Sequence, residues 1–340
     1  VSILSLIIFT SCSQHEPRTE TKNTIYLYSN TDPTSLDPRI GGDRTTQVFI
    51  RELFEALDRL DPNGVPEPAL AKSTTISEDG KTYTFTLHES KWSNGLPVTS
   101  KDFEFAWKSA LAPSFPSPHS YVLYIIQNAK QCKLGKCSQN NIGIQTPDDH
   151  TLIVILEHPA PYFLELLSNP LFYPICKQSV NNNPNWATNN PKFISNGPYI
   201  LREYLFKDKL VLEQNPLYWN PIKPKTQVLH FDIIENPQTA TDMFLRKELD
   251  WLGEPFGNIP IEMKKHLKKE NKLYQTDYGN LFMLNCNTRL PHLSSPKIRR
   301  AIASCINRQS LCMELLQGGE QAAFSVLAPQ FSHAFPTFKD

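Results

Sequence analysis

The fold is decided by two adjoining stretches, Asp79-Gly-Lys-Thr-Tyr-Thr-Phe-Thr-Leu87 and Lys91-Trp-Ser-Asn-Gly-Leu-Pro-Val-Thr-Ser-Lys-Asp-Phe103. In the first stretch, apolar side chains at positions 83, 85 and 87 alternate with threonines, and this period of two predicts a strand with one buried face. In the second, a Ser-Asn-Gly turn follows Trp92, and Thr99 with Asp102 has the spacing of a capping box that begins a helix. We therefore expect a strand, a tight turn packed under a tryptophan and a capped helix.

Around this centre, helix and strand patterns alternate irregularly. Apolar residues recur at helical spacing over residues 45–60 and predict one helix, which ends at the turn Asp61-Pro-Asn-Gly64. Residues 151–156 form a nearly continuous β-branched and aliphatic run, typical of a strand buried on both faces. Further patterns predict a hairpin over 199–213, strands at 230–234 and 274–285, and helices at 239–249, 297–306 and 308–317. The whole is typical of a mixed α/β protein.

The composition excludes several classes of function. Lys plus Arg and Asp plus Glu both total 34, and the resulting net charge of +0 argues against a protein built to bind nucleic acid. The 340 residues suggest about two domains, and 13 glycines against 28 prolines leave little material for phosphate-binding loops. The sequence also lacks the motifs Gly-x-Gly-x-x-Gly, Gly-x4-Gly-Lys-Ser/Thr, Gly-x-Ser-x-Gly and His-Glu-x-x-His.

No group of residues predicts catalysis or a metal site. Asp148-Asp149 is interpreted as a turn and not as a metal or acid/base site, because no third ligand lies nearby. His150 and His158 stand on either side of a predicted strand and are interpreted as surface or hydrogen-bonded polar groups. Cys132-Lys-Leu-Gly-Lys-Cys137 is interpreted as a disulfide or two free thiols, since a lone pair without a second Cys/His pair is a weak zinc signal. We expect a protein that is not an enzyme and needs no metal or cofactor.

The N-terminus has the features of an export signal. Residues 1–11 carry no charge and are too few to span a bilayer, which needs ~20 residues, but they match the apolar core of a signal peptide. Thr10-Ser11-Cys12 resembles the cleavage site of bacterial lipoproteins, in which Cys12 would become the acylated first residue. Phe9 stands where that pattern usually has leucine, and no basic residue precedes the run. The alternative is a buried N-terminal strand with an incidental cysteine.

The stretches quoted first closely resemble the signature of the bacterial extracellular solute-binding proteins of family 5, which include oligopeptide- and dipeptide-binding proteins. Further matches run in the same order over about residues 24–330: Ser35-Leu-Asp-Pro38, Leu53-Phe-Glu-Ala-Leu57, Asp148-Asp-His-Thr-Leu152, Pro161-Tyr-Phe163, Asn196-Gly-Pro-Tyr199, Asn215-Pro-Leu-Tyr-Trp-Asn220, Arg299-Arg-Ala-Ile302 and Asn307-Arg308. The resemblance implies an α/β, periplasmic binding protein-like fold of class II and of the large peptide-binding type. By the same resemblance we expect two lobes around a cleft, with an incomplete C-terminal lobe.

The resemblance also implies the division of the chain. Residues 1–22 would be a lipoprotein signal remnant and polar tether, and residues 23–53 plus 177–279 a first, discontinuous domain. Residues 54–176 would be an inserted second domain that carries the signature, and residues 280–340 the start of a truncated third domain. Since members of this branch commonly continue beyond the point that matches Asp340, we expect exposed apolar side chains near the last helices.

In this family, two lobes close over an extended peptide whose backbone pairs with protein strands. The resemblance therefore implies the extracytoplasmic solute-binding component of an ABC importer, which binds oligopeptides in the cleft and delivers them to the inner-membrane permease. We expect a monomer in the periplasm, held to the membrane by a lipid anchor at Cys12, with no nucleic-acid partner.

By position, the resemblance implies three ligand-facing stretches: Gly41, Gly42 and Asp43; His119; and Asn280, Leu281 and Phe282. The glycines would let another backbone approach and Asp43 would meet a charged ligand group, with an ordinary turn as the alternative. His119 stands where the oligopeptide branch usually has an aromatic hydroxyl, with an exposed loop histidine as the alternative. The strand at 280–282 would pair with the peptide backbone, unless it is a plain core strand.

Two further interpretations stay open. The chain could be a non-transport interaction lipoprotein, a remnant that retains the fold but has lost ligand binding. Within the transport interpretation, the ligand could be a dipeptide, a cell-wall peptide or a metal chelate. A hydrolase is least favoured, because no nucleophile and base stand in a recognisable pattern.

Overall fold

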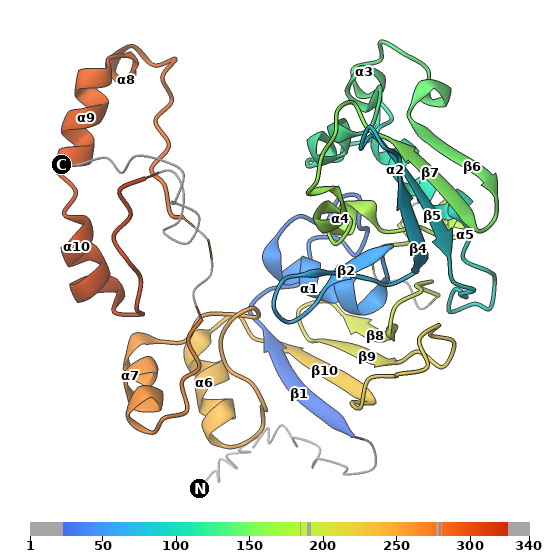
Figure 1. The fold of residues 1–340 in the computed structure, drawn as a ribbon. Helices are drawn as coiled ribbons and strands as arrows, with labels where there is room; N and C mark the ends of the chain where they lie inside the picture. Colours follow the sequence, from blue (N-terminus) through green and yellow to red (C-terminus); the bar gives the residue numbers. More distant parts are fainter. Residues whose placement is uncertain (1–22, 184, 189–191, 277–278, 280, 326–340) are drawn as a thin grey trace, which may run out of the picture. The chain divides into compact units, whose positions relative to one another are not determined.

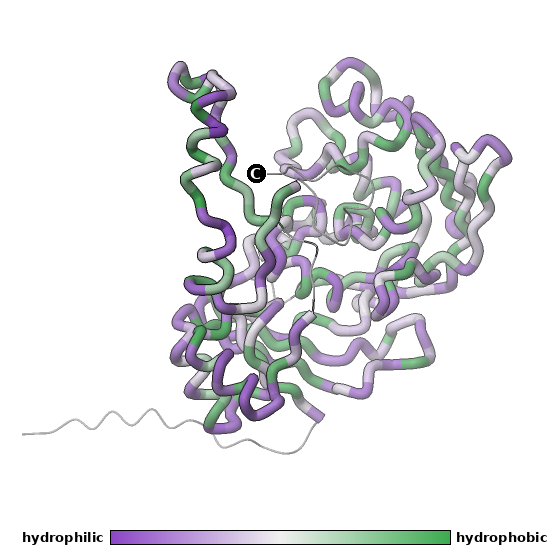
Figure 2. Tube along the Cα trace, turned by 60° about the vertical axis from the view of Figure 1, so that its left-hand side comes forward, coloured by the Kyte–Doolittle hydropathy of each residue, from purple (hydrophilic) through white to green (hydrophobic). Residues whose placement is uncertain are grey.

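The structure, a computed structural model, describes residues 23–183, 185–188, 192–276, 279 and 281–325. The chain divides into two compact units, Val1–Gly257 and Asn258–Asp340 (Figure 1). Hydrophilic and hydrophobic positions alternate over short distances along the chain (Figure 2). None of the helices in the described part is long and apolar enough to cross a membrane. The predicted division into four parts stays a prediction.

The first sheet of the first unit combines strands from both ends of that unit. It contains β1 (Thr24–Ser29), β8 (Tyr199–Leu205), β9 (Lys209–Gln214) and β10 (Val228–Ile233) in the order β1-β10-β9-β8. β1 runs parallel to β10, whereas the other neighbours are antiparallel. The predicted hairpin is β8 and β9, and Lys207 in its turn has a φ of 60°.

The second sheet is antiparallel throughout. Its order is β4 (Ala71–Ile76), β5 (Thr82–Leu87), β7 (Thr151–Ile155) and β6 (Ile144–Asp148). β5 is the predicted strand, with its three apolar side chains buried. The prediction that β7 is buried on both faces is wrong, because Leu152 and Val154 are buried while Ile153 and Ile155 are only half-buried. An antiparallel sheet often packs one face on the core and leaves the other partly solvated.

The turn and helix of the quoted stretch form as predicted. Gly95 has a φ of 89° and donates its N–H to the Trp92 carbonyl at 2.8 Å, which closes the turn. Helix α2 (Ser100–Ala110) then begins with the Asp102 carboxylate accepting the Thr99 N–H at 2.8 Å. Asp102 also accepts the indole N–H of the buried Trp92 at 3.4 Å, so turn and helix share one polar centre.

Helix α1 (Arg44–Leu53) is shorter than the predicted helix over 45–60, which is therefore wrong beyond Leu53. Phe54 already has an extended backbone, with φ of −125° and ψ of 154°. At this point the chain pairs with a distant segment: Gly197 donates its N–H to the Leu53 carbonyl at 2.8 Å, and the Asn196 side chain accepts the Glu55 N–H at 3.1 Å. These tertiary bonds replace the next helical turn.

The remaining elements of the first unit are short. β2 (Asp58–Leu60) and β3 (Pro66–Pro68) pair as a small antiparallel ladder. The others are η1 (Ser120–Ile125), α3 (Ala129–Lys133), η2 (Gln139–Asn141), α4 (Phe163–Leu166), η3 (Pro170–Phe172), α5 (Lys177–Asn182) and α6 (Pro237–Leu245). Buried apolar side chains from both sheets and from α1 and α2 form one continuous core. For example, the Phe49 ring of α1 meets Phe231 of β10 edge to face at 4.9 Å.

The second unit contains helices α7 (Ile261–Lys269), α8 (Pro291–Ser294), α9 (Pro296–Ser304), α10 (Arg308–Ser310) and η4 (Leu311–Leu316). The predicted helices at 297–306 and 308–317 correspond to α9 and to α10 with η4. The strand predicted at 274–285 is wrong for the described residues of that stretch, which take no regular structure. Phe282 is 98% exposed, and Met313 and Leu315 are also exposed, so the expected exposed apolar side chains are present.

Candidate functional site

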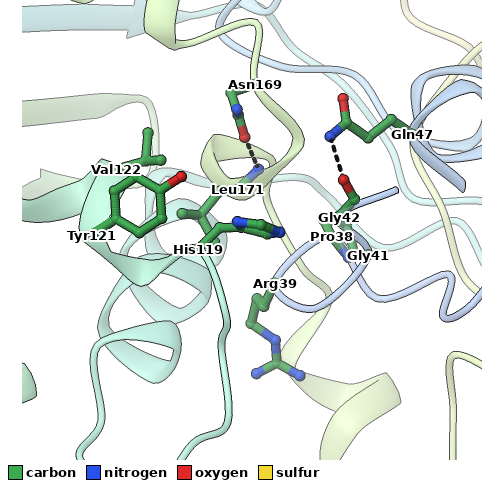
Figure 3. A pocket seen from close by; sticks show the side chains of 10 residues that line it. All are labelled: Pro38, Arg39, Gly41, Gly42, Gln47, His119, Tyr121, Val122, Asn169 and Leu171. Carbon is green, nitrogen blue, oxygen red and sulfur yellow. Dashed lines mark hydrogen bonds between the residues drawn. The ribbon is translucent and has the colours of Figure 1, made fainter. Parts of the chain in front are cut away.

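A cavity of about 220 Å³ lies in the first unit where three segments meet (Figure 3). These segments are the loop before α1 with the first turn of that helix, the start of η1, and the loop at η3. The lining residues are Pro38, Arg39, Gly41, Gly42, Gln47, His119, Tyr121, Val122, Asn169 and Leu171. Three of the predicted site residues, Gly41, Gly42 and His119, are thus brought to one cavity.

Both glycines lie in close contact with other parts of the protein. A Cβ atom on Gly42 would lie 2.1 Å from Nε2 of His119, so only glycine admits the ring at this place. A Cβ atom on Gly41 would lie 2.7 Å from both Cδ1 of Ile50 and the Ser35 carbonyl oxygen. Figure 3 shows the His119 ring directed towards Gly42. Gly42 therefore positions His119 at the cavity, a role that the sequence pattern did not predict.

Arg39 fixes the loop that carries these glycines. It is 4% exposed, and its guanidinium group holds the Asp37 carboxylate with a fork of hydrogen bonds of 2.9 Å and 2.6 Å. The same group donates to the Ser109 hydroxyl at 2.8 Å and lies 4.4 Å from the centre of the Phe115 ring. Because Asp37 neutralises it, Arg39 stiffens the loop rather than offering a free charge to a ligand. Sequence reasoning missed Arg39, and its spacing from Asp37 was the available signal.

Asp43 has a structural task at the start of α1. Its carboxylate accepts the Thr46 N–H at 2.9 Å and the Thr34 hydroxyl at 2.7 Å, which makes it the N-cap of the helix. Partial burial raises the pKa of Asp43, but the hydrogen bonds from Thr46 and Thr34 outweigh it and leave the pKa below its ordinary value. Asp43 is therefore ionised and engaged within the protein. Contact with a charged ligand group stays a prediction.

The polar groups that line the cavity include several possible hydrogen-bond donors. The Asn169 side-chain oxygen accepts the Leu171 N–H at 3.0 Å, which leaves the Asn169 amide NH₂ available. Gln47 donates to the Gly42 carbonyl at 3.1 Å and closes the loop. The Tyr121 ring, which is 62% exposed, lies 6.1 Å from the His119 ring, centre to centre. His119, Tyr121 and Asn169 together can donate hydrogen bonds to carbonyl or carboxylate oxygens.

Comparison with known proteins identifies the family. Residues 65–340 match the family model described as bacterial extracellular solute-binding proteins, family 5 Middle. The chain belongs to this family. Over 310 residues it is 36% identical to the oligopeptide-binding protein OppA of Bacillus subtilis, an alignment that covers 91% of this chain and 57% of that protein.

Solved structures of the family show the same fold. The murein tripeptide-binding protein MppA of Escherichia coli superposes with a TM-score of 0.84 at 29% identity, covering 93% of this chain and 62% of that one. The Haemophilus influenzae OppA complex with the peptide RPPGFSPFR gives a TM-score of 0.80 at 27% identity, covering 92% and 61%. The implied periplasmic binding protein-like α/β fold is thus confirmed. The chain spans about three-fifths of the length of these relatives.

The structure does not test the other residues that the family resemblance assigned. Leu281 and Phe282 belong to the second unit, and Asn280 lies outside the described residues. Leu281 is half-buried and Phe282 is exposed. Cys12 also lies outside the described residues. The parts assigned to these residues stay predictions.

The remaining chemistry of the described chain is sparse. Its His, Cys, Asp and Glu side chains form no group of three that could hold a metal ion. The six cysteines from Cys132 to Cys312 are free thiols. Asp148 accepts the His150 N–H at 2.8 Å, and Asp149 pairs with Lys101 at 2.8 Å. The turn interpretation of Asp148-Asp149 is therefore confirmed.

Proposed function

We propose that this chain is the solute-binding component of an ABC importer, which binds oligopeptides in an interlobe cleft and delivers them to the inner-membrane permease. Membership of family 5 is the observation that carries the proposal. The names of two relatives support it, the oligopeptide-binding OppA of Bacillus subtilis and the peptide-bound OppA of Haemophilus influenzae. The role is binding and presentation of a ligand, without catalysis.

The cavity at Gly42 and His119 is the proposed ligand contact of the first unit. A peptide offers a carbonyl oxygen at every residue, and the donors His119, Tyr121 and Asn169 suit such acceptors. Contacts with main-chain oxygens add affinity without reading the peptide sequence. Gly41, Asp43, Asn280, Leu281 and Phe282 are the further ligand-facing positions of the proposal.

The proposed location is outside the cytoplasm. Relatives from Escherichia coli and Salmonella typhimurium are named periplasmic oligopeptide-binding proteins. The sequence Thr10-Ser11-Cys12 supports a lipid anchor at Cys12. Expression in a bacterial host with a labelled fatty acid tests the anchor: label on the wild-type chain, but not on a Cys12→Ala variant, is the expected result.

Calorimetric titration with unmodified peptides of two to nine residues tests binding. We expect heat of binding for the wild-type chain and about a fivefold loss of affinity for His119→Ala, because one neutral hydrogen bond contributes about 1 kcal/mol. His150→Ala is the matched control, since His150 is an exposed histidine in the turn between β6 and β7. Equal affinities for the two variants would remove His119 from the site.

A second candidate function is an interaction lipoprotein that retains the fold without ligand binding. It is favoured by the exposed Phe282, Met283 and Leu284, which lie where a peptide-pairing strand was expected. The same titration decides between the two functions. No heat with any peptide, from a chain that unfolds cooperatively on heating, would favour the interaction lipoprotein.

A further inference from the structure

Two cysteines meet at the C-terminal end of α3. The Cys132 N–H donates to the Asn128 carbonyl at 3.0 Å, as the helix requires. The Cys137 thiol also points to that carbonyl oxygen, with its Sγ atom 3.6 Å away. The Asn128 carbonyl oxygen thus accepts hydrogen bonds from both cysteines, although the segment between them leaves the helix.

The backbone between the cysteines reverses in a defined way. Gly135 has a φ of 71°, its N–H donates to the Cys132 carbonyl at 2.9 Å, and the Lys136 N–H donates to the Gln131 carbonyl at 2.9 Å. These two bonds form a Schellman motif, the common termination of a helix by glycine. The reversal returns Cys137 to the helix turn that bears Cys132.

The two thiols differ in exposure. Cys132 is 1% exposed, whereas Cys137 is half-buried at the edge of the apolar core. The pKa of Cys132 is raised, first by burial and then by the nearby Cys137 sulfur and its hydrogen bond. Cys137 is therefore the thiol that an oxidant reaches first, and Cys132 is the neighbour that completes the reaction.

We propose that Cys132 and Cys137 form a disulfide bond when the protein meets a thiol-disulfide oxidant such as oxidised glutathione. The Cys137 thiolate attacks one sulfur of the oxidised glutathione, which forms a mixed disulfide and releases one glutathione thiolate. Cys132 loses its proton and attacks the Cys137 sulfur, which releases the second glutathione. Two protein thiols thereby lose two protons and two electrons, and one glutathione disulfide becomes two glutathione thiols.

The bond would fasten a segment that supports the cavity. Lys133, the last residue of α3, donates from its ammonium group to the carbonyls of Ala110 and Ala112 at 3.0 Å and of Phe115 at 2.6 Å. These carbonyls end α2 and lead towards His119. A covalent link across the end of α3 would hold Lys133 in that position. The proposal rests on the proposed function in one respect: the location outside the cytoplasm would supply the oxidising compartment.

Peptide mapping of the full chain tests the proposal. The purified protein is equilibrated with mixtures of oxidised and reduced glutathione, quenched with acid, alkylated in denaturant and cleaved with trypsin. Cleavage after Lys133 and Lys136 separates the two cysteines, so only a disulfide can hold their fragments together. A second digestion with Asp-N, which cuts before Asp148, separates Cys137 from Cys176 and assigns the bond. We expect the linked fragments, lighter by two hydrogen atoms than the sum of the free thiol fragments, and their loss on reduction.

Cys305 and Cys312 provide a matched pair in the same sample, because they are also close in sequence and at least as accessible. Linked fragments from Cys132 and Cys137 alone support the proposal. Alkylation of both residues at every glutathione ratio, or equal linkage of Cys305 to Cys312, would overturn it. None of these readouts needs peptide binding, so failure of the proposed function stays distinguishable.

Two variants, each with one cysteine replaced, test the order of attack, and their thermal unfolding shows whether they are folded. Cys132→Ser should trap glutathione on Cys137, because the second thiol is missing, whereas Cys137→Ser should leave Cys132 unmodified. The half-buried Cys137 is the safer substitution, and its thermal unfolding midpoint should match that of the reduced wild-type chain. Glutathione on neither variant, in proteins that unfold cooperatively, would contradict the proposed order of attack.

Discussion

Strand β5 carries apolar side chains at every second position and residues 281–284 are all apolar, but the surroundings of these side chains are opposite. Phe85 of β5 is 0% exposed and faces Thr74 of β4 and Leu152 of β7 across two ladders. Phe282 is 98% exposed, and its segment takes no regular structure. The difference shows that an apolar run becomes a stable strand only when neighbours supply both the ladder and the packing.

Replacing each phenylalanine by alanine should give the largest difference in the free energy of unfolding between the two regions. Phe85→Ala is expected to lower the free energy of unfolding by about 3–5 kcal/mol, because it leaves a cavity in the core. Phe282→Ala should change it by less than about 0.5 kcal/mol, since an exposed side chain has little packing to lose. Urea unfolding of both variants measures the difference. Similar losses for the two would mean that residues 281–284 are packed in solution.

Gly197 and Gly42 give a second contrast, this time within the first unit. A Cβ atom on Gly197 would lie 2.5 Å from the Leu53 carbonyl carbon and 2.6 Å from the Phe54 N atom, both of which are backbone. On Gly42 its three nearest neighbours would be atoms of the His119 ring, a half-buried side chain that can turn aside. The backbone atoms of Leu53 and Phe54 that a Cβ at position 197 would meet cannot turn aside in this way.

Gly197→Ala should therefore cost about 3 kcal/mol, at the upper end of overpacking effects, whereas Gly42→Ala should cost less than about 1 kcal/mol. Gly42→Ala should still weaken peptide binding, because it displaces His119 from the cavity. Chemical unfolding and peptide titration of both variants separate the two effects. A Gly42→Ala variant with wild-type affinity would show that the position of His119 does not matter to the ligand.

Local patterns predicted the parts of the fold whose causes are local. The alternation in β5 and the Thr99–Asp102 capping interaction depend on residues next to each other in sequence, and both are present. The end of α1 could not be read in this way, because Asn196 and Gly197 end the helix from far along the chain. The prediction of a strand over 274–285 is wrong for the described residues, because an apolar pattern does not show whether a neighbouring strand is present to pair with it.

The candidate site was predictable only through the family resemblance. Gly41, Gly42 and His119 were selected by position, and the structure brings them to one cavity. Asn169 and Arg39 were not selected. The spacing of Asp37 and Arg39 was a local signal that went unused, whereas the burial of Arg39 and the place of Asn169 at the cavity arise from tertiary contacts. Resemblance thus supplied the location of the cavity, while the structure supplied the donors that face it.

Three carboxyl groups extend the comparison of buried and exposed positions to the dependence of stability on pH. Burial raises the pKa of Glu52, at the end of α1, from 4.5 to about 7, and the nearby Glu55 carboxylate adds to the shift. Burial likewise raises the pKa of Asp58 to about 6. In the second unit, by contrast, a hydrogen bond and the charge of Lys272 lower the pKa of the exposed Glu270.

Glu52→Gln should make the stability of the protein less dependent on pH. Below the unfolded pKa of 4.5, Glu52 is protonated in both states, and its full contribution to stability is present. As the pH rises from 4.5 through about 7, the carboxyl group of the folded protein must ionise in a partly buried site, and stability is lost. We expect the loss between pH 5 and pH 8 to shrink by about 1–2 kcal/mol in the variant, less than the shift alone implies because Glu52 is half-buried.

Glu270→Gln is the control for this measurement, since its lowered pKa places its titration below the range of the experiment. Urea midpoints of the wild-type chain and both variants at pH 5, 6, 7 and 8 provide the data. The Glu270→Gln curve should follow the wild type, and the Glu52→Gln curve should be flatter. Asp58 still titrates in this range, so some slope should remain. Parallel curves for all three proteins would show that Glu52 reaches water as freely as Glu270 does.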